Sequence, residues 1–315
     1  MISNKDKIYI AGHTGMLGSA IHRLLSKKGF NNIISASHQE LNLTDSRAVE
    51  NFFRSNRPDV VILAAAKVGG IQANIDFPAE FLYENLMIQS NVIHHSYLNS
   101  VKNFCFLGSS CIYPKECLQP MSEEYLLAGP LEPTNEGYAL AKISGLKMIE
   151  YYKRQYGFSG MSLMPCNLYG TNDSFDPLHS HVLSALVKKI DDATELGIQE
   201  ICLWGSGVAR REFMHVDDAA AATLFFLESN VFASSLINVG WGEDISIKEL
   251  ASKIALKAGY KGSFTWDTTK PDGMLKKCLD ISKMKDYGFT PTISLDEGIL
   301  KTIEEYKALK INKGL

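Results

Sequence analysis

The sequence lacks any hydrophobic run long enough to cross a membrane. No uninterrupted apolar stretch approaches the roughly 20 residues that a membrane-spanning helix requires. The first apolar run, Ile8–Ala11, is also too short to be the core of a signal peptide. We therefore expect a cytoplasmic protein with no membrane partner.

The chain also lacks a cysteine framework and an excess of charge of either sign. Its six cysteines are scattered without a CxxC pair, so we expect neither a zinc or other metal site nor a disulfide scaffold. Lys and Arg number 32 and Asp and Glu number 35, and neither sign dominates a long stretch. The positive surface of a nucleic-acid binder is therefore not expected, and small molecules are the favoured partners.

Strand-like and helix-like segments alternate along the first half of the chain. Short apolar runs indicate strands at residues 8–12, 33–37, 60–66, 103–107 and 162–168. Apolar residues at helical spacing indicate helices at residues 16–27, 46–55, 79–98 and 138–156. Uninterrupted apolar strands that alternate with helices are typical of a parallel sheet covered on both faces. The predicted fold class is α/β, with a doubly wound parallel-sheet Rossmann domain.

A change of pattern near residue 170 indicates a domain boundary, because the chain becomes rich in loop-forming residues there. We expect the dinucleotide-binding Rossmann domain to comprise residues 1–172 and a smaller α/β substrate-binding domain to comprise residues 173–315. A helical pattern at residues 216–227 indicates that about 213–240 returns to the first domain.

Three glycines follow the first predicted strand at a spacing of three. Gly12, Gly15 and Gly18 stand between that strand and the first helix, where a dinucleotide-binding turn is found. Glycines there permit close approach of backbone N–H groups to a pyrophosphate, which the helix N-terminus stabilises. The context favours a dinucleotide site over a turn without a ligand.

The choice between NAD and NADP is open at this stage. An acidic residue after the second strand would bind the ribose 2′-hydroxyl of NAD, and a basic residue would accept the 2′-phosphate of NADP. The chain instead has small residues and one histidine there, from Ser35 to Gln39 with His38 among them.

Tyr138 and Lys142 form a Y-x-x-x-K pair whose side chains lie on one helix face. Ketone reduction requires a proton on oxygen, and a nearby ammonium would lower the pKa of a phenol toward the working pH. Ser109, which follows the fourth strand, would hydrogen-bond the same oxygen. The alternative is a tyrosine packed on the core with a solvated lysine, but the glycine loop and the serine favour catalysis.

Several longer segments resemble the GDP-L-fucose synthases, which are extended short-chain dehydrogenases/reductases. They are residues 11–18 (AGHTGMLG), 107–114 (LGSSCIYP), 132–142 (EPTNEGYALAK), 164–170 (MPCNLYG), 204–207 (WGSG), 211–218 (REFMHVDD) and 270–273 (KPDG). The resemblance implies an NADP-dependent enzyme that epimerises GDP-4-keto-6-deoxymannose at C3 and C5 and then reduces C4. It also implies a homodimer formed through residues 79–98 and 138–156.

The same resemblance implies roles for individual residues. Cys111 and His181 correspond to the acid and base of epimerisation, which suits carbons made acidic by the C4 ketone, and the reducing residues are Ser109, Tyr138 and Lys142. The substrate ligands are Lys189, Trp204, Arg211 and Asp272. The cofactor ligands are Gly12, His13, Thr14, Gly15, Met16, Leu17, Gly18, His38, Leu107, Gly108, Ser109, Ser110, Lys142, Pro165, Cys166, Asn167, Leu168 and His181.

The sequence departs from the family at two positions that bear on the cofactor. Thr14 and His38 stand where members often have arginines that bind the 2′-phosphate, so the resemblance implies NADP(H) without excluding NAD(H). Gly137 replaces a common proline before the catalytic tyrosine and removes no reacting group.

Three other functions compete with this reading. One is an epimerase-reductase or C4-reductase of a related GDP-4-keto sugar such as a 6-deoxyheptose. Another is a nucleotide-sugar 4-epimerase with tightly held NAD, which would not need Cys111 or His181. The last is a regulatory protein that binds the cofactor without turnover, against which the intact Ser109, Tyr138 and Lys142 argue.

Overall fold

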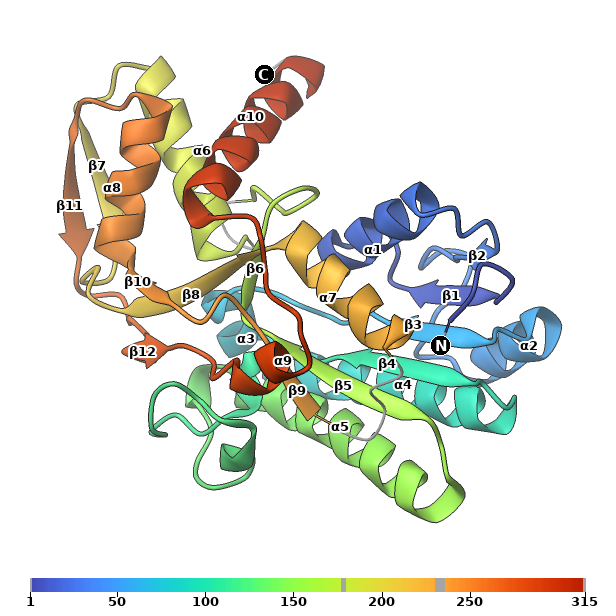
Figure 1. Cartoon of the computed structure of the whole chain (residues 1–315). Coiled ribbons are helices and arrows are strands. Elements are labelled where there is room, and N and C mark those ends of the chain that lie inside the picture. Colours follow the sequence, from blue (N-terminus) through green and yellow to red (C-terminus); the bar gives the residue numbers. More distant parts are fainter. Residues whose placement is uncertain (1, 177–179, 230–235, 314–315) are drawn as a thin grey trace.

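The computed structural model describes residues 2–176, 180–229 and 236–313. The described residues form three sheets and two hydrophobic cores, and all but one of the strands of the largest sheet come from the first 170 residues (Figure 1). Among the described residues, no helix combines the length and the hydrophobicity that a transmembrane segment requires.

The larger sheet has six parallel strands within the described residues, in the order β2-β1-β3-β4-β5-β9. The strands are β1 (Ile8–Ala11), β2 (Ile33–Ile34), β3 (Val60–Leu63), β4 (Asn103–Leu107), β5 (Gly160–Pro165) and β9 (Leu236–Val239). Every residue of β1, β3, β5 and β9 is buried, which explains their uninterrupted apolar sequences. The predicted doubly wound α/β fold class is confirmed.

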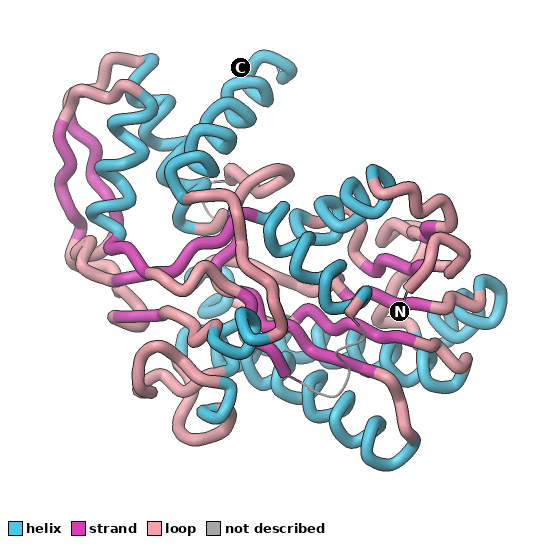
Figure 2. Tube along the Cα trace, viewed as in Figure 1, coloured by secondary structure: helices cyan, strands magenta, loops and turns pink. Residues whose placement is uncertain are grey.

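Helices cover both faces of this sheet (Figure 2). On one face α1 (Met16–Lys27) packs against α7 (Val216–Glu228). On the other face α4 (Pro78–Leu98) packs between α2 (Ser46–Asn56) and α5 (Glu136–Tyr156). The short helix α3 (Ile71–Asp76) follows β3 and contacts the 3-10 turn η3 (Pro133–Asn135).

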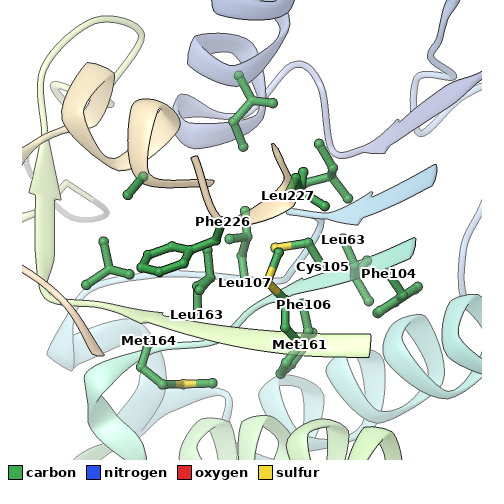
Figure 3. Packing of buried hydrophobic residues seen from close by; sticks show 14 of the residues in the cluster. Leu63, Phe104, Cys105, Phe106, Leu107, Met161, Leu163, Met164, Phe226 and Leu227 are labelled. Carbon is green, nitrogen blue, oxygen red and sulfur yellow. The ribbon is translucent and has the colours of Figure 1, made fainter. Parts of the chain in front are cut away.

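The core between the sheet and α7 is built from large apolar side chains (Figure 3). Met161 and Leu163 come from β5, and Phe226 comes from α7. All three side chains are fully buried. This packing holds the carboxyl ends of the central strands, and the loops that follow them, in fixed positions.

The smaller part of the chain pairs β8 (Arg210–His215) with β6 (Asn167–Tyr169), β10 (Asp244–Ser246) and β12 (Lys276–Lys277). A separate parallel pair joins β7 (Glu200–Trp204) to β11 (Ser263–Asp267). Helices α6 (Val182–Glu195), α8 (Ile247–Ala258) and α10 (Leu295–Lys313) share the second core, while α9 (Ser282–Asp286) lies beside β9.

The expectation of one strand at residues 162–168 was wrong. The chain forms β5 up to Pro165 and then β6 from Asn167, and these strands belong to different sheets. Cys166 still bonds to the first sheet, because its N–H donates to Val239 O of β9 at 2.9 Å, whereas the next residue, Asn167, pairs with Phe213 of β8. The second predicted strand is also shorter than expected, because β2 ends at Ile34.

Candidate active site

The glycine loop is held by backbone contacts that only glycine permits. Gly12 has a φ of 87°, and a Cβ added to Gly18 would lie 2.0 Å from the Gly12 carbonyl oxygen. Gly15 is the N-cap of α1 and provides no side-chain cap, so the first N–H groups of the helix are left for a ligand. This arrangement fits the pyrophosphate of a dinucleotide.

The predicted cofactor ligands lie near the carboxyl ends of the parallel strands. His13 and Thr14 follow β1, His38 follows β2, and Gly108 to Ser110 follow β4. Pro165 ends β5, and Asn167 begins β6 beside it. Ligands of open parallel sheets bind at this edge, so the fold brings these residues to one side of the molecule.

Lys142 and Tyr138 stand one turn apart on α5, next to the end of β4. The Lys142 ammonium donates a hydrogen bond to Leu107 O at 2.9 Å and lies 5.7 Å from the centre of the Tyr138 ring. Burial lowers the pKa of Lys142 to about 8. The lysine is thus positioned by the same strand that carries Ser109 at its end.

The expectation that Lys142 lowers the pKa of the phenol is not met. Burial raises the pKa of Tyr138, the neighbouring Cys111 raises it further, and a hydrogen bond with Ser109 opposes this rise only in part. The cost of removing a phenolate from water exceeds these favourable contacts. Tyr138 is therefore a protonated phenol, which suits it to donate a proton.

Cys111 lies on the 3-10 turn η1 (Ser110–Ile112) and is buried. Its backbone N–H donates to Ser109 Oγ at 3.4 Å. Burial raises the pKa of the Cys111 thiol, whereas the Lys277 ammonium and Ser109 lower it. Burial outweighs these contacts, so the pKa of Cys111 is raised overall and the thiol can donate a proton, while the positive charge of Lys277 favours the thiolate form that accepts one.

His181 is the N-cap of α6 and faces the same cavity as Cys111. Its Nδ1 lies 3.4 Å from Asp173 Oδ1. The Asp173 carboxylate raises the pKa of His181, because it stabilises the imidazolium. Ser184 Oγ and the Ser174 N–H in turn hold the Asp173 carboxylate. His181 is thereby oriented by a carboxylate and favoured in its proton-donating form.

The cavity has a volume of about 380 Å³ and brings together most of the predicted substrate ligands. Arg211 lines it and donates to the carbonyl oxygens of Asp272, at 3.0 Å, and Met274, at 2.6 Å. Trp204 lines it as well, and its Nε1 donates to Pro271 O at 2.9 Å. These residues share the cavity with Cys111, Asn167 and His181.

Two predicted substrate ligands have contacts that limit their roles. Lys189 is exposed, is not part of the cavity lining, and donates to Cys202 O. The Asp272 carboxylate accepts from the N–H and the hydroxyl of Ser206, at 2.8 and 2.6 Å, so it positions the loop that follows Trp204. The role of Lys189 as a substrate ligand stays a prediction, because Lys189 does not line the cavity in this conformation.

Sequence reasoning missed several residues of the cavity wall. Lys277 pairs with Arg211 across β12 and β8, and burial lowers the pKa of Lys277 while Cys111 opposes this shift. Three further residues line the cavity from α3 and η3, namely Asn74, Glu132 and Asn135. The sequence did not indicate that Asn74 would point into the cavity, because the helix α3 was not predicted. Glu132 and Asn135 do fall in the segment 132–142 that carries the family resemblance.

The comparisons with known proteins agree with this geometry. The model of the NAD dependent epimerase/dehydratase family matches residues 8–240. A protein of Arabidopsis thaliana named putative GDP-L-fucose synthase 2 is 50% identical, over 97% of this chain and 93% of that protein. The GDP-L-fucose synthase of Escherichia coli (strain K12) is also 50% identical, over 96% of each chain.

A solved structure shows that the likeness extends to the whole fold. The GDP-mannoheptose C4 reductase of Campylobacter jejuni, with NADP bound, has a TM-score of 0.90 and 37% identity, covering 98% of this chain and all of that one. This structural match and the 50% sequence identity over nearly the full length together identify the family. The chain belongs to the GDP-L-fucose synthases of the NAD dependent epimerase/dehydratase family.

Proposed function

We propose that this chain converts GDP-4-keto-6-deoxy-D-mannose to GDP-L-fucose, by epimerisation at C3 and C5 and reduction at C4. The observation that carries the proposal is the meeting of Cys111 and His181 in one cavity, with Tyr138 beside Cys111. Two protonic groups are needed to invert a carbon next to a ketone, and one acid is needed to protonate the ketone oxygen.

The roles follow from the charges of these groups. Cys111 and His181 exchange the protons at C3 and C5, with Lys277 favouring the thiolate and Asp173 favouring the imidazolium. Bound NADPH supplies the hydride for C4. Tyr138 then donates its phenolic proton to the oxygen at C4, and Ser109 holds that oxygen in place.

The proposal is tested by incubation with GDP-4-keto-6-deoxymannose and NADPH in deuterated water, with the product analysed by mass and NMR. We expect GDP-fucose that carries deuterium at C3 and C5. The likeness to a GDP-mannoheptose C4 reductase favours one alternative, a C4-reductase of a related keto sugar. A reduced product without deuterium at C3 and C5 would support that alternative, and absence of turnover would point to a different sugar.

We further propose NADP(H) as the cofactor, bound without the arginines that other members place at the 2′-phosphate. The loop after β2 instead carries Glu40, whose carboxylate accepts from the Ser37 N–H and hydroxyl at 2.7 and 2.8 Å. These hydrogen bonds lower the pKa of Glu40, so a negative charge lies in the loop after β2. We therefore expect only modest selectivity for NADPH over NADH.

Fluorescence titration of the binary complexes tests this expectation. The variant Thr14→Arg should tighten NADPH binding by about 10- to 150-fold, because a charge-assisted hydrogen bond contributes roughly 1.5 to 3 kcal/mol. The dissociation constant of NADH should change little, since NADH has no 2′-phosphate. Equal effects on both cofactors would contradict a 2′-phosphate site beside Thr14.

We also propose a homodimer formed through α4 and α5, which lie side by side on one face of the sheet (Figure 1). Their outer surfaces expose Tyr83, Leu140, Tyr151 and Tyr156. Large apolar side chains gathered on two adjacent helices are typical of a helical dimer interface.

Light scattering should therefore give twice the chain mass of 34.9 kDa. The double variant Tyr83→Glu, Leu140→Glu is expected to give the monomer mass, because two charges would be buried without partners. Leu256→Glu is the matched control, since Leu256 is exposed on α8. A monomeric mass for the unaltered chain would refute the proposal.

A further inference from the structure

Polar groups without partners are concentrated in the wall of the active-site cavity. Among the described residues, eight buried side-chain nitrogen or oxygen atoms have no hydrogen-bond partner. Four of these atoms belong to residues that line the cavity, namely Asn74, Glu132, Asn135 and Ser180. Buried polar groups are nearly always hydrogen-bonded, so a cluster of exceptions at one cavity indicates a ligand that completes them.

Asn74 has only an acceptor to offer to this ligand. Its side-chain amide donates to the carbonyl oxygens of Gly69 and Gly70, both at 3.0 Å, so its two donor hydrogens are already used. Its Oδ1 is buried without a partner, and the residue is 7% exposed. The unfilled requirement is therefore for a hydrogen-bond donor on the ligand.

Asn135 lies on η3, which contacts the helix α3 of Asn74, and both residues line the cavity. It is the N-cap of α5, yet its side chain makes no capping hydrogen bond, and its buried Oδ1 has no partner. An asparagine at this position usually stabilises a helix through a hydrogen bond from its cap. The orientation of Asn135 into the cavity gives up that stabilisation.

Glu132 differs from the two asparagines, because its Oε2 lies 3.4 Å from Lys115 Nζ. An ion pair therefore accounts for it, and we leave it out of the ligand set. The two amide oxygens that stay without partners are those of Asn74 and Asn135. Both residues come from elements beside the start of α5. Asn135 stands three residues before Tyr138 in the sequence.

We infer that Asn74 and Asn135 form a hydroxyl-binding subsite for the C2–C3 edge of the sugar. This inference rests on the proposed function, in which Tyr138 protonates the oxygen at C4. The neighbouring donors of a 4-keto-6-deoxyhexose are its C2 and C3 hydroxyls, whereas C4 and C6 carry none. The subsite adds substrate specificity to that function, because it selects hexoses that keep these hydroxyls.

Calorimetric titration with GDP and with GDP-L-fucose tests the inference. We expect Asn135→Ala to weaken GDP-L-fucose binding by about 2- to 12-fold, the effect of one neutral hydrogen bond of roughly 0.5 to 1.5 kcal/mol. GDP binding should not change, because GDP has no sugar at this end. Asn135→Asp keeps an acceptor and should restore most of the lost affinity, and Asn74→Ala should repeat the selective loss.

The 2-deoxy and 3-deoxy analogues of GDP-L-fucose identify the hydroxyl that is bound. Asn135→Ala should no longer weaken binding of the analogue that lacks this group. Equal weakening of GDP and GDP-L-fucose, or no change in either, would overturn the inference. The proposed function is judged separately by the deuterium assay, so turnover with an unaffected Asn135→Ala would remove the subsite alone.

Discussion

The variant Tyr138→Phe should lose C4 reduction by about 10²- to 10⁴-fold while deuterium exchange at C3 and C5 continues. General acid catalysis by a positioned group contributes a rate factor of this size. Burial raises the pKa of Tyr138, so the phenol is protonated and ready to donate. Phenylalanine keeps the ring and removes only the donor, and it leaves Cys111 and His181 in place.

Two readouts on the same sample separate these activities. Loss of absorbance by NADPH measures reduction, and NMR in deuterated water measures exchange. Tyr9→Phe is the matched control, because Tyr9 is a buried tyrosine that lies away from the cavity, on β1 against Phe52 and Phe53. If Tyr138→Phe loses both activities and remains folded, the division of roles is wrong.

The variant Cys111→Ser should show the reverse pattern, with exchange lowered by about 10²- to 10⁴-fold and reduction of the keto sugar retained. A serine hydroxyl loses its proton far less readily than a thiol. The Lys277 ammonium, which favours the thiolate of Cys111, is too weak an influence to ionise an alcohol. The reduced product should then be a sugar that kept its original configuration at C3 and C5.

Product configuration by NMR gives the readout for this second variant. Cys202→Ser is the control, because Cys202 is exposed and outside the cavity lining, and it should leave both activities unchanged. Unchanged exchange in Cys111→Ser would exclude the thiol as one of the two exchanging groups.

Patterns local in the sequence predicted the framework well. The strand at residues 103–107 and the helix at residues 16–27 have the predicted bounds, since each is a single apolar pattern between clear turns. The join at Pro165 was missed, because an apolar pattern does not reveal where a chain passes from one sheet to another. The division into domains at residue 172 stays a prediction.

The sequence by itself determined the doubly wound fold, the glycine loop and the family, because each depends on residues close together along the chain. Only the tertiary structure decided which side chains share a cavity and what their charges do. Lys277 lies near Cys111, and Asn74 and Asn135 line one cavity, because segments distant in the sequence are in contact. Burial likewise reversed the expected pKa of Tyr138, since desolvation depends on everything packed around a group and not on its neighbours in sequence.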